Sequence, residues 1–262
     1  MKAIKSPASP WRMAWAGALV GLALASVVYA PARWLAEGLQ AASGDQLQLQ
    51  NARGSVWTGS AQLVLAAGAG SADAAALPGR VHWRIRPDWN GFHAEVQADC
   101  CAPQPLQAAA RLDGLGSIVF TLADSQSQWP AALLSGLGTP WNTVQPQGQL
   151  NVSSQALGAQ WQQGRWTVSG QAQMDVTQLS SRLSTLTPMG SYRLTLQGGS
   201  PTRLVLATLE GSLQLSGQGQ WVGQTLRFKG EASAAPDRQD ALSNLLNILG
   251  RREGTRTLIN LG

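Results

Sequence analysis

Alternation of apolar and polar residues is the feature of this sequence that most constrains its fold. In RVHWRIR, residues 80–86, the side chains of Val81, Trp83 and Ile85 fall on one face of an extended chain. FHAEVQA, residues 92–98, alternates in the same way, and the intervening PDWNG has the composition of a turn. The same period recurs in residues 148–153, 165–176, 192–197, 203–209, 212–221, 225–233 and 255–261. The sequence therefore predicts a mainly β protein with a large, twisted antiparallel sheet. One interpretation of the same pattern is that the sheet is also curled.

Composition agrees with extended sheets rather than helix bundles. Only 13% of the residues are charged, against about 25% in an average soluble domain. Glycines inside the alternating runs weaken strands, but they allow strong coiling and close approach of backbones. Helical patterns are few, and we expect short helices within residues 127–138 and 237–250. A soft boundary near residues 138–146 could divide the sheet into two halves.

The N-terminus has the pattern of a membrane anchor. The sequence is uncharged from Met13 to Ala32, which is long enough to cross a bilayer of about 30 Å as a helix. Aromatic residues stand near both ends of this stretch, as at a membrane interface. The preceding basic residues, Lys2, Lys5 and Arg12, favour a cytoplasmic N-terminus. We expect a cytoplasmic tail at 1–12, a single transmembrane span at 13–32 and a periplasmic β-rich domain at 33–262.

A cleaved signal peptide is the competing interpretation of the same segment. The sequence Val28-Tyr29-Ala30 resembles a cleavage site. However, Pro31 would follow the cut bond, where proline is poorly tolerated. We therefore favour an uncleaved anchor, which mass spectrometry of the mature N-terminus can check.

Catalytic and ligand-binding motifs are not found in the sequence. It has two histidines and none of the common patterns for metalloproteases, serine hydrolases, nucleotide phosphates or dinucleotides. No Cys/His spacing indicates a metal site. Once the three N-terminal basic residues are set aside, the net charge falls from +5 to about +2, which does not indicate a nucleic-acid surface. We expect no enzyme activity, cofactor, metal or nucleic-acid partner.

Six of the eleven tryptophans are candidate structural or contact residues. Four lie in or beside alternating runs and near glycine, where packing in the core is favoured over an aromatic-lined groove for an acyl chain or glycan: Trp57, Trp83, Trp166 and Trp221. Trp89 and Trp141 lie in turns and are better candidates for exposed contacts. In ARGSVWTGSAQLVL, residues 52–65, we expect Trp57 to fill the space left by Gly54 and Gly59.

Cys100 and Cys101 are adjacent and are the only cysteines. In an oxidising compartment they could form a strained ring with each other, stay as thiols or pair between chains. Neither residue is assigned a role from the sequence.

An ordered set of segments resembles a known family. GSVWTGSAQLVL followed by LPGRVHWRIRP is similar to the start of the periplasmic domain of protein N of the type II secretion system. LTPMGSYRLTLQGG, LATLEGSLQLSGQGQW, LRFKGEASA and ALSNLLNILG resemble its C-terminal part. The layout of basic tail, single span and β-rich domain also matches, so the resemblance covers roughly residues 11–262.

The resemblance implies a non-enzymatic accessory component of the inner-membrane platform of a Gram-negative secretion machine. Its partners would be other bitopic subunits of that platform. The Gly-x-x-Trp-x-Gly opening is also similar to that of AsmA-like inner-membrane proteins. That similarity gives the alternative function, a periplasmic protein that binds or carries lipid.

Overall fold

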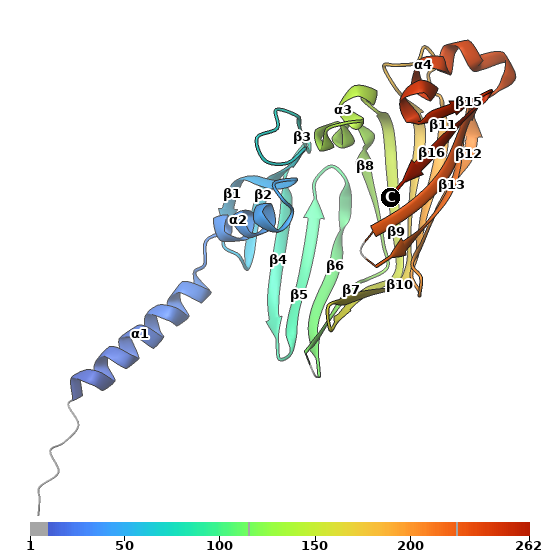
Figure 1. Cartoon of the computed structure of the whole chain (residues 1–262). Helices are drawn as coiled ribbons and strands as arrows, with labels where there is room; N and C mark the ends of the chain where they lie inside the picture. Colours follow the sequence, from blue (N-terminus) through green and yellow to red (C-terminus); the bar gives the residue numbers. More distant parts are fainter. Residues whose placement is uncertain (1–9, 115, 224) are drawn as a thin grey trace, which may run out of the picture.

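One curled antiparallel sheet makes up most of the molecule (Figure 1). The computed structural model describes residues 10–114, 116–223 and 225–262; most of the predicted tail at 1–12 lies outside these residues. The sheet has 16 strands in the order β1-β2-β4-β5-β6-β7-β9-β10-β11-β12-β13-β14-β16-β15, with β3 added beside β2 and β8 beside β9. Its two ends, β1 and β15, curve toward the same side, so that the sheet forms an open trough.

The strands follow the alternating runs of the sequence. Those of the first half are β1 (Leu47–Gly54), β2 (Thr58–Ala66), β3 (Ala74–Ala76), β4 (Val81–Asp88), β5 (Gly91–Ala98), β6 (Ala102–Asp113), β7 (Ser117–Leu122) and β8 (Ser125–Pro130). Those of the second half are β9 (Gln147–Gln162), β10 (Arg165–Ser180), β11 (Gly190–Gln197), β12 (Arg203–Gly211), β13 (Leu213–Val222), β14 (Thr225–Ala234), β15 (Arg251–Glu253) and β16 (Arg256–Leu261). The prediction of a mainly β, antiparallel fold is confirmed.

The helices are short, apart from the first. They are α1 (Pro10–Val28), α2 (Ala32–Ala42), the 3-10 helix η1 (Ala131–Leu137), α3 (Trp141–Val144), the 3-10 helix η2 (Pro236–Arg238) and α4 (Gln239–Leu249). The prediction of a helix at 127–138 was wrong for its first residues, because β8 continues to Pro130 and pairs with β9. The predicted soft boundary at 138–146 contains α3, and strands from both sides of it join one sheet because β7 pairs with β9.

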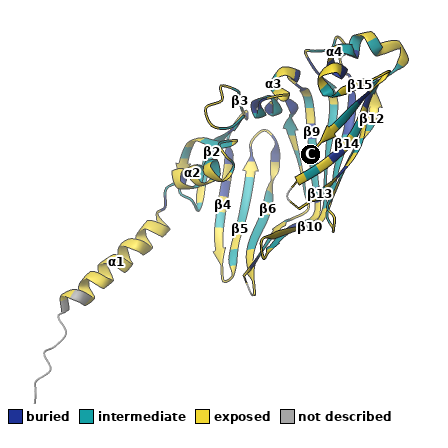
Figure 2. Cartoon of the chain, in the orientation of Figure 1, coloured by how far each residue is buried: buried dark blue, intermediate teal, exposed yellow. Residues whose placement is uncertain are grey.

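Three apolar clusters hold the helices to one end of the trough. Leu242, Leu245 and Leu246 of α4 pack with Tyr192 and Leu213 of the sheet. Leu133 of η1 packs against β4 and the turn between β5 and β6, and Ala32 of α2 packs against β2 and β4. Buried positions gather at this end, whereas the opposite tips of the strands are exposed (Figure 2). The helices therefore close one end of the trough and leave the other open.

Glycines allow aromatic rings to lie flat on the sheet at two places. The Phe228 ring of β14 lies over Gly217, Gly219 and Gly230, and a methyl group on Gly217 would overlap that ring. At the other end of the sheet, a methyl group on Gly59 would lie 2.5 Å from Cζ2 of Trp83. Rings thus make the close contacts at these glycines, whereas Gly170 of β10 closely approaches the backbone of Ala156, as expected of strand glycines.

The predicted segment 13–32 is not one continuous helix. α1 ends at Val28, and the next helix begins at Ala32. Between them, Ala30 is buried and Pro31 forms a β-bridge with Ser55, so these residues belong to the folded domain. Among the residues that the structure describes, no helix combines the length and the apolar character needed to cross a membrane.

We predict that Gly217→Ala destabilises the sheet by about 1–3 kcal/mol, because the buried Phe228 ring must move to make room for the methyl group. Chemical denaturation of the full chain in detergent measures the difference. Ser216→Ala, an exposed change one residue earlier, is the matched control and should stay within about 0.5 kcal/mol of the original chain. When Phe228→Leu is added to Gly217→Ala, the smaller side chain should recover part of the lost stability. Equal stability of Gly217→Ala and the original chain would contradict this account of the packing.

Candidate functional site

The middle of the trough has an apolar inner face built by strand register. Alternate residues of β4, β5, β6, β7, β9 and β10 point to this face, and pairing aligns them into two rows across the strands. One row is Phe92, Ala110, Phe120, Ala159 and Val168. The other is Ile85, Ala94, Ala108, Leu122 and Leu157. Both rows have alanine on β6 and a larger residue, Phe120 or Leu122, on β7; toward β4 the rows end in Phe92 and Ile85.

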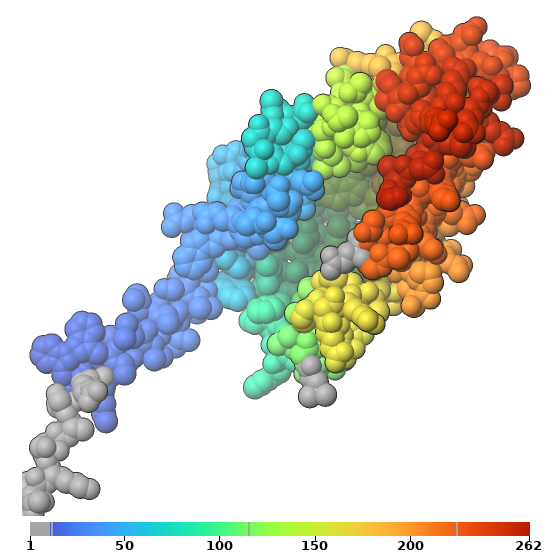
Figure 3. Space-filling view, viewed as in Figure 1, coloured from blue at the N-terminus to red at the C-terminus, as the bar shows by residue number. Residues whose placement is uncertain are grey.

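This difference in side-chain size produces a hollow of about 690 Å³. Alanines form its floor, Trp57, Ile85 and Phe92 form one wall, and leucines and Phe120 form the other. Among the lining residues only Thr121 has a hydroxyl side chain. It pairs with Ala109 and alternates with the inward residues Phe120 and Leu122, so it belongs to the opposite face of the strand. Figure 3 shows this side of the molecule hollowed over the central green strands, between the blue N-terminal elements and the orange C-terminal strands.

Trp57 joins this hollow to the N-terminal helix. Its indole Nε1 donates a hydrogen bond at 2.8 Å to the carbonyl oxygen of Val27, in the last turn of α1, where carbonyls lack partners within the helix. Its ring stacks on Phe92 with centroids 6.4 Å apart. The backbone N–H of the preceding residue, Val56, donates to Ala30 at 2.9 Å. One short loop therefore holds the helix end and forms a wall of the hollow.

The expected packing of Trp57 against Gly54 and Gly59 was wrong. Trp83 covers Gly59 instead, and it is the buried tryptophan of this region, 6% exposed. Its Nε1 donates to the carbonyl oxygens of Ser55 and Val56 at 3.2 and 3.1 Å. Trp57 is only half-buried. Trp83 is therefore packed in the core as the sequence predicts, whereas Trp57 is not fully buried.

The other candidate tryptophans lie outside the hollow's lining. The core packing predicted for Trp166 was wrong, because this residue lies near the exposed tip of the β9–β10 hairpin and is 54% exposed. Its ring packs on Phe120, with centroids 5.8 Å apart. Trp89 is fully exposed at the tip of the β4–β5 hairpin, Trp141 is 40% exposed on α3, and Trp221 is half-buried near the end of β13. At the hairpin tip, the carboxyl group of Asp88 accepts a hydrogen bond from the backbone N–H of Trp89 and is also hydrogen-bonded to the side chain of His93. These two contacts, the first being the larger effect, lower the pKa of Asp88.

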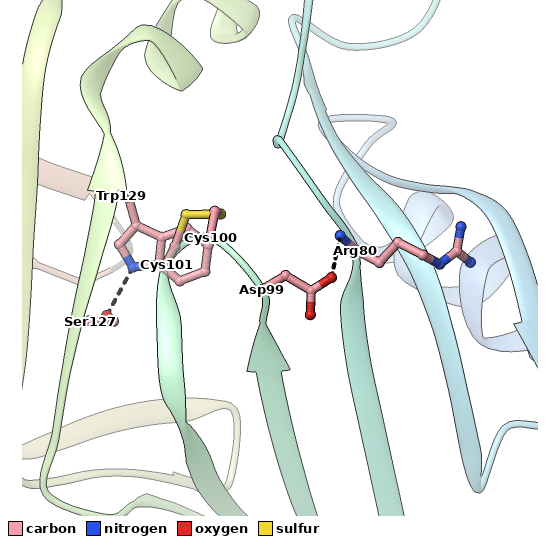
Figure 4. Close-up of a disulfide and its surroundings, with 6 residues drawn as sticks. All are labelled: Arg80, Asp99, Cys100, Cys101, Ser127 and Trp129. Carbon is pink, nitrogen blue, oxygen red and sulfur yellow. Dashed lines mark hydrogen bonds between the residues drawn. A yellow bond between two sulfur atoms is a disulfide. The ribbon is translucent and has the colours of Figure 1, made fainter.

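Cys100 and Cys101 form a disulfide with each other in the turn between β5 and β6 (Figure 4). Cys101 is buried in the cluster below η1, and its carbonyl oxygen accepts a hydrogen bond from the backbone N–H of Gln128. Figure 4 also shows Asp99 hydrogen-bonded to the backbone of Arg80, and Trp129 to Ser127. This pair lies at the closed end of the trough, away from the hollow. In the part of the chain that the structure describes, no three His, Cys, Asp or Glu residues gather to hold a metal ion.

The part of the chain that forms the sheet matches a known protein family. The family model described as type II secretion system (T2SS), protein N matches residues 45–258. The chain belongs to this family. The match begins just before β1 and ends within β16, so it covers the trough from edge to edge. Comparison with curated proteins and with solved structures finds no significant match. The resemblance inferred from the sequence is confirmed, and with it a role in type II secretion in association with other components of that machinery.

We predict that Trp57→Phe loosens the attachment of α1 while leaving most of the domain's stability in place. Phenylalanine keeps the stacking on Phe92 but removes the indole donor, a loss of about 1 kcal/mol. Because Trp57 is half-buried, Trp57→Ala should cost less than the about 3–5 kcal/mol of a fully buried tryptophan.

Limited proteolysis of the detergent-solubilised chain measures the effect at residues 29–31. Cleavage there should be faster in Trp57→Phe and unchanged in Trp89→Phe, which alters a fully exposed ring. Equal cleavage of both variants and the original chain would show that the indole hydrogen bond does not hold α1.

Proposed function

We propose that this protein is a non-enzymatic accessory component of the inner-membrane platform of the type II secretion system, acting through protein–protein contacts in the periplasm. The family match over the whole sheet carries the proposal. A long open sheet suits an assembly role because its edge strands offer backbone groups to a partner. The function of the chain then lies in its surfaces and edges.

α1 supports attachment of the chain to the membrane. It leaves the sheet and exposes apolar side chains along its length, among them Leu19, Leu22, Leu24 and Val28 (Figure 1). A helix that is apolar on all sides normally has a covering of protein or lipid. The uncharged run from Met13 to Val28 in α1 and the basic residues before it favour insertion with the N-terminus in the cytoplasm and the sheet in the periplasm.

The two ends of the sheet differ in what they offer a partner strand. β15 is three residues long and carries Arg251, Arg252 and Glu253, which is the charged, short edge that discourages strand addition. β1 is eight residues long, has the sequence LQLQNARG and pairs with β2 alone among the named strands. We therefore propose β1 as the edge at which another platform subunit adds a strand.

Deleting the gene in its host tests the proposed function. We expect secretion of type II substrates to fall, or the level of at least one other platform protein to fall, and the original chain to restore both. Full export with all platform proteins at normal levels would argue against a role in the platform.

A pair of variants tests the β1 edge. Gln48→Lys with Gln50→Lys places two charges on β1, where they should weaken strand addition and reduce co-purification with platform subunits. Gln107→Lys, an exposed change on the interior strand β6 opposite Glu95, is the control and should leave co-purification unchanged. Equal co-purification of all three chains would exclude β1 as the contact.

A further inference from the structure

We propose that the apolar hollow of the trough binds one acyl chain of a membrane lipid, which enters from the bilayer beside the end of α1. This site goes beyond a platform role, and its route of entry depends on the proposed membrane attachment of α1. The inference is built on the lining of the hollow, the shape of its floor and the position of its wall next to the helix.

The lining selects an apolar ligand. Among the residues that the structure describes, no charged side chain lines the hollow, and the inward rows across it are alanine, leucine, isoleucine, valine and phenylalanine. A glycan would leave its hydroxyl groups without hydrogen-bond partners on this surface, which costs free energy. A peptide would meet the same difficulty, because the backbone groups of interior strands are already used within the sheet. A hydrocarbon chain has no polar groups to satisfy.

The floor has the form of a binding site rather than of incomplete packing. Ala94, Ala108 and Ala110 are neighbouring small residues in the inward positions of β5 and β6, between Phe92 on one side and Phe120 and Leu122 of β7 on the other. Small-molecule sites commonly enclose about 300–1,000 Å³, and this hollow has about 690 Å³. Its aromatic walls stay partly exposed, with Phe92 at 48% and Phe120 at 41%. The hollow is therefore open to an occupant along the side of the trough.

The position of the hollow indicates where that occupant comes from. Trp57 forms part of its wall and also hydrogen-bonds to Val27, the penultimate residue of α1. Beyond this contact the exposed apolar surface of α1 begins, with Val27 itself 55% exposed. The apolar surface of the helix is thus continuous with the wall of the hollow. A lipid in contact with α1 can place one chain in the hollow while its headgroup stays outside.

Photocrosslinking in vesicles tests this site with the full chain. The chain is reconstituted into phosphatidylethanolamine–phosphatidylglycerol vesicles that contain a small fraction of phosphatidylethanolamine with a diazirine near the end of one acyl chain. After illumination, mass spectrometry maps the modified peptides. We expect two groups of crosslinks, one on α1 and one on the strand residues that line the hollow, at 108–110, 120–122 and 157–159. Crosslinks on α1 report the membrane attachment, and crosslinks in the hollow report the proposed site.

Filling the floor supplies the matched test. Ala108→Phe places a ring on the inner face of β6, and crosslinking in the hollow should fall by about tenfold, as loss of contact with a few methylene groups would produce. Gln107→Phe adds the same ring to the opposite, exposed face of the same strand and should leave all crosslinks unchanged. If Ala108→Phe does not fold, Ala110→Leu fills the same floor one row away.

Two results would overturn the proposal. Crosslinks confined to α1 in the original chain would show that lipid surrounds the helix but does not enter the hollow. Equal crosslinking of the hollow in the original chain and in the folded filled variant would show that the label reaches the strands without occupying the site. Either result leaves the platform role standing, because that role is measured by secretion and by co-purification.

Discussion

Small residues on the inner face of the sheet are the constraint on which the structure depends. A sheet this long must coil to bury its apolar face, and coiling brings neighbouring strands and rings close together. At the C-terminal end, the glycines of β13 and β14 make room for Phe228, and at the N-terminal end Gly59 makes room for Trp83. In the middle, the inward positions of β5 and β6 include three alanines, and the rings of Phe92 and Phe120 flank them. The hollow is therefore the uncovered central part of one continuous pattern.

Much of the fold could be predicted from the sequence, because period-two alternation is a local signal. The runs at 80–86 and 92–98 correspond closely to β4 and β5, and the run at 165–176 lies within β10. Predictions failed where long-range pairing overrides local composition. Residues 127–130 have a helical pattern, yet β9 is sixteen residues long and leaves an edge that β8 pairs with. Likewise, contacts between distant residues show that the domain begins before residue 33, because Val56 donates to Ala30 and Pro31 bridges to Ser55.

Less of the site could be predicted, because local spacing does not say which ring covers which glycine. Trp57 is two residues from Gly59, but the strand pairing places Trp83 directly opposite that glycine. Alanines at inward positions of FHAEVQA and LQAAARLD indicate the floor of the hollow, because a filled core would need larger residues there. In sheets of this kind, a run of small residues at inward positions on adjacent strands is as informative as the large ones beside it.

Trp57 connects the hollow to the N-terminal helix. The indole donates to the end of α1 through its nitrogen and presents its ring to the hollow, so one side chain contacts both. By thermodynamic linkage, an occupant that packs on this ring alters the strength of the helix attachment, and displacement of the helix alters the affinity for the occupant by the same factor. In a platform subunit, this linkage would couple the state of the surrounding bilayer to the orientation of the sheet. The coupling would extend to β1, because α2 packs against β1 at the same end of the molecule.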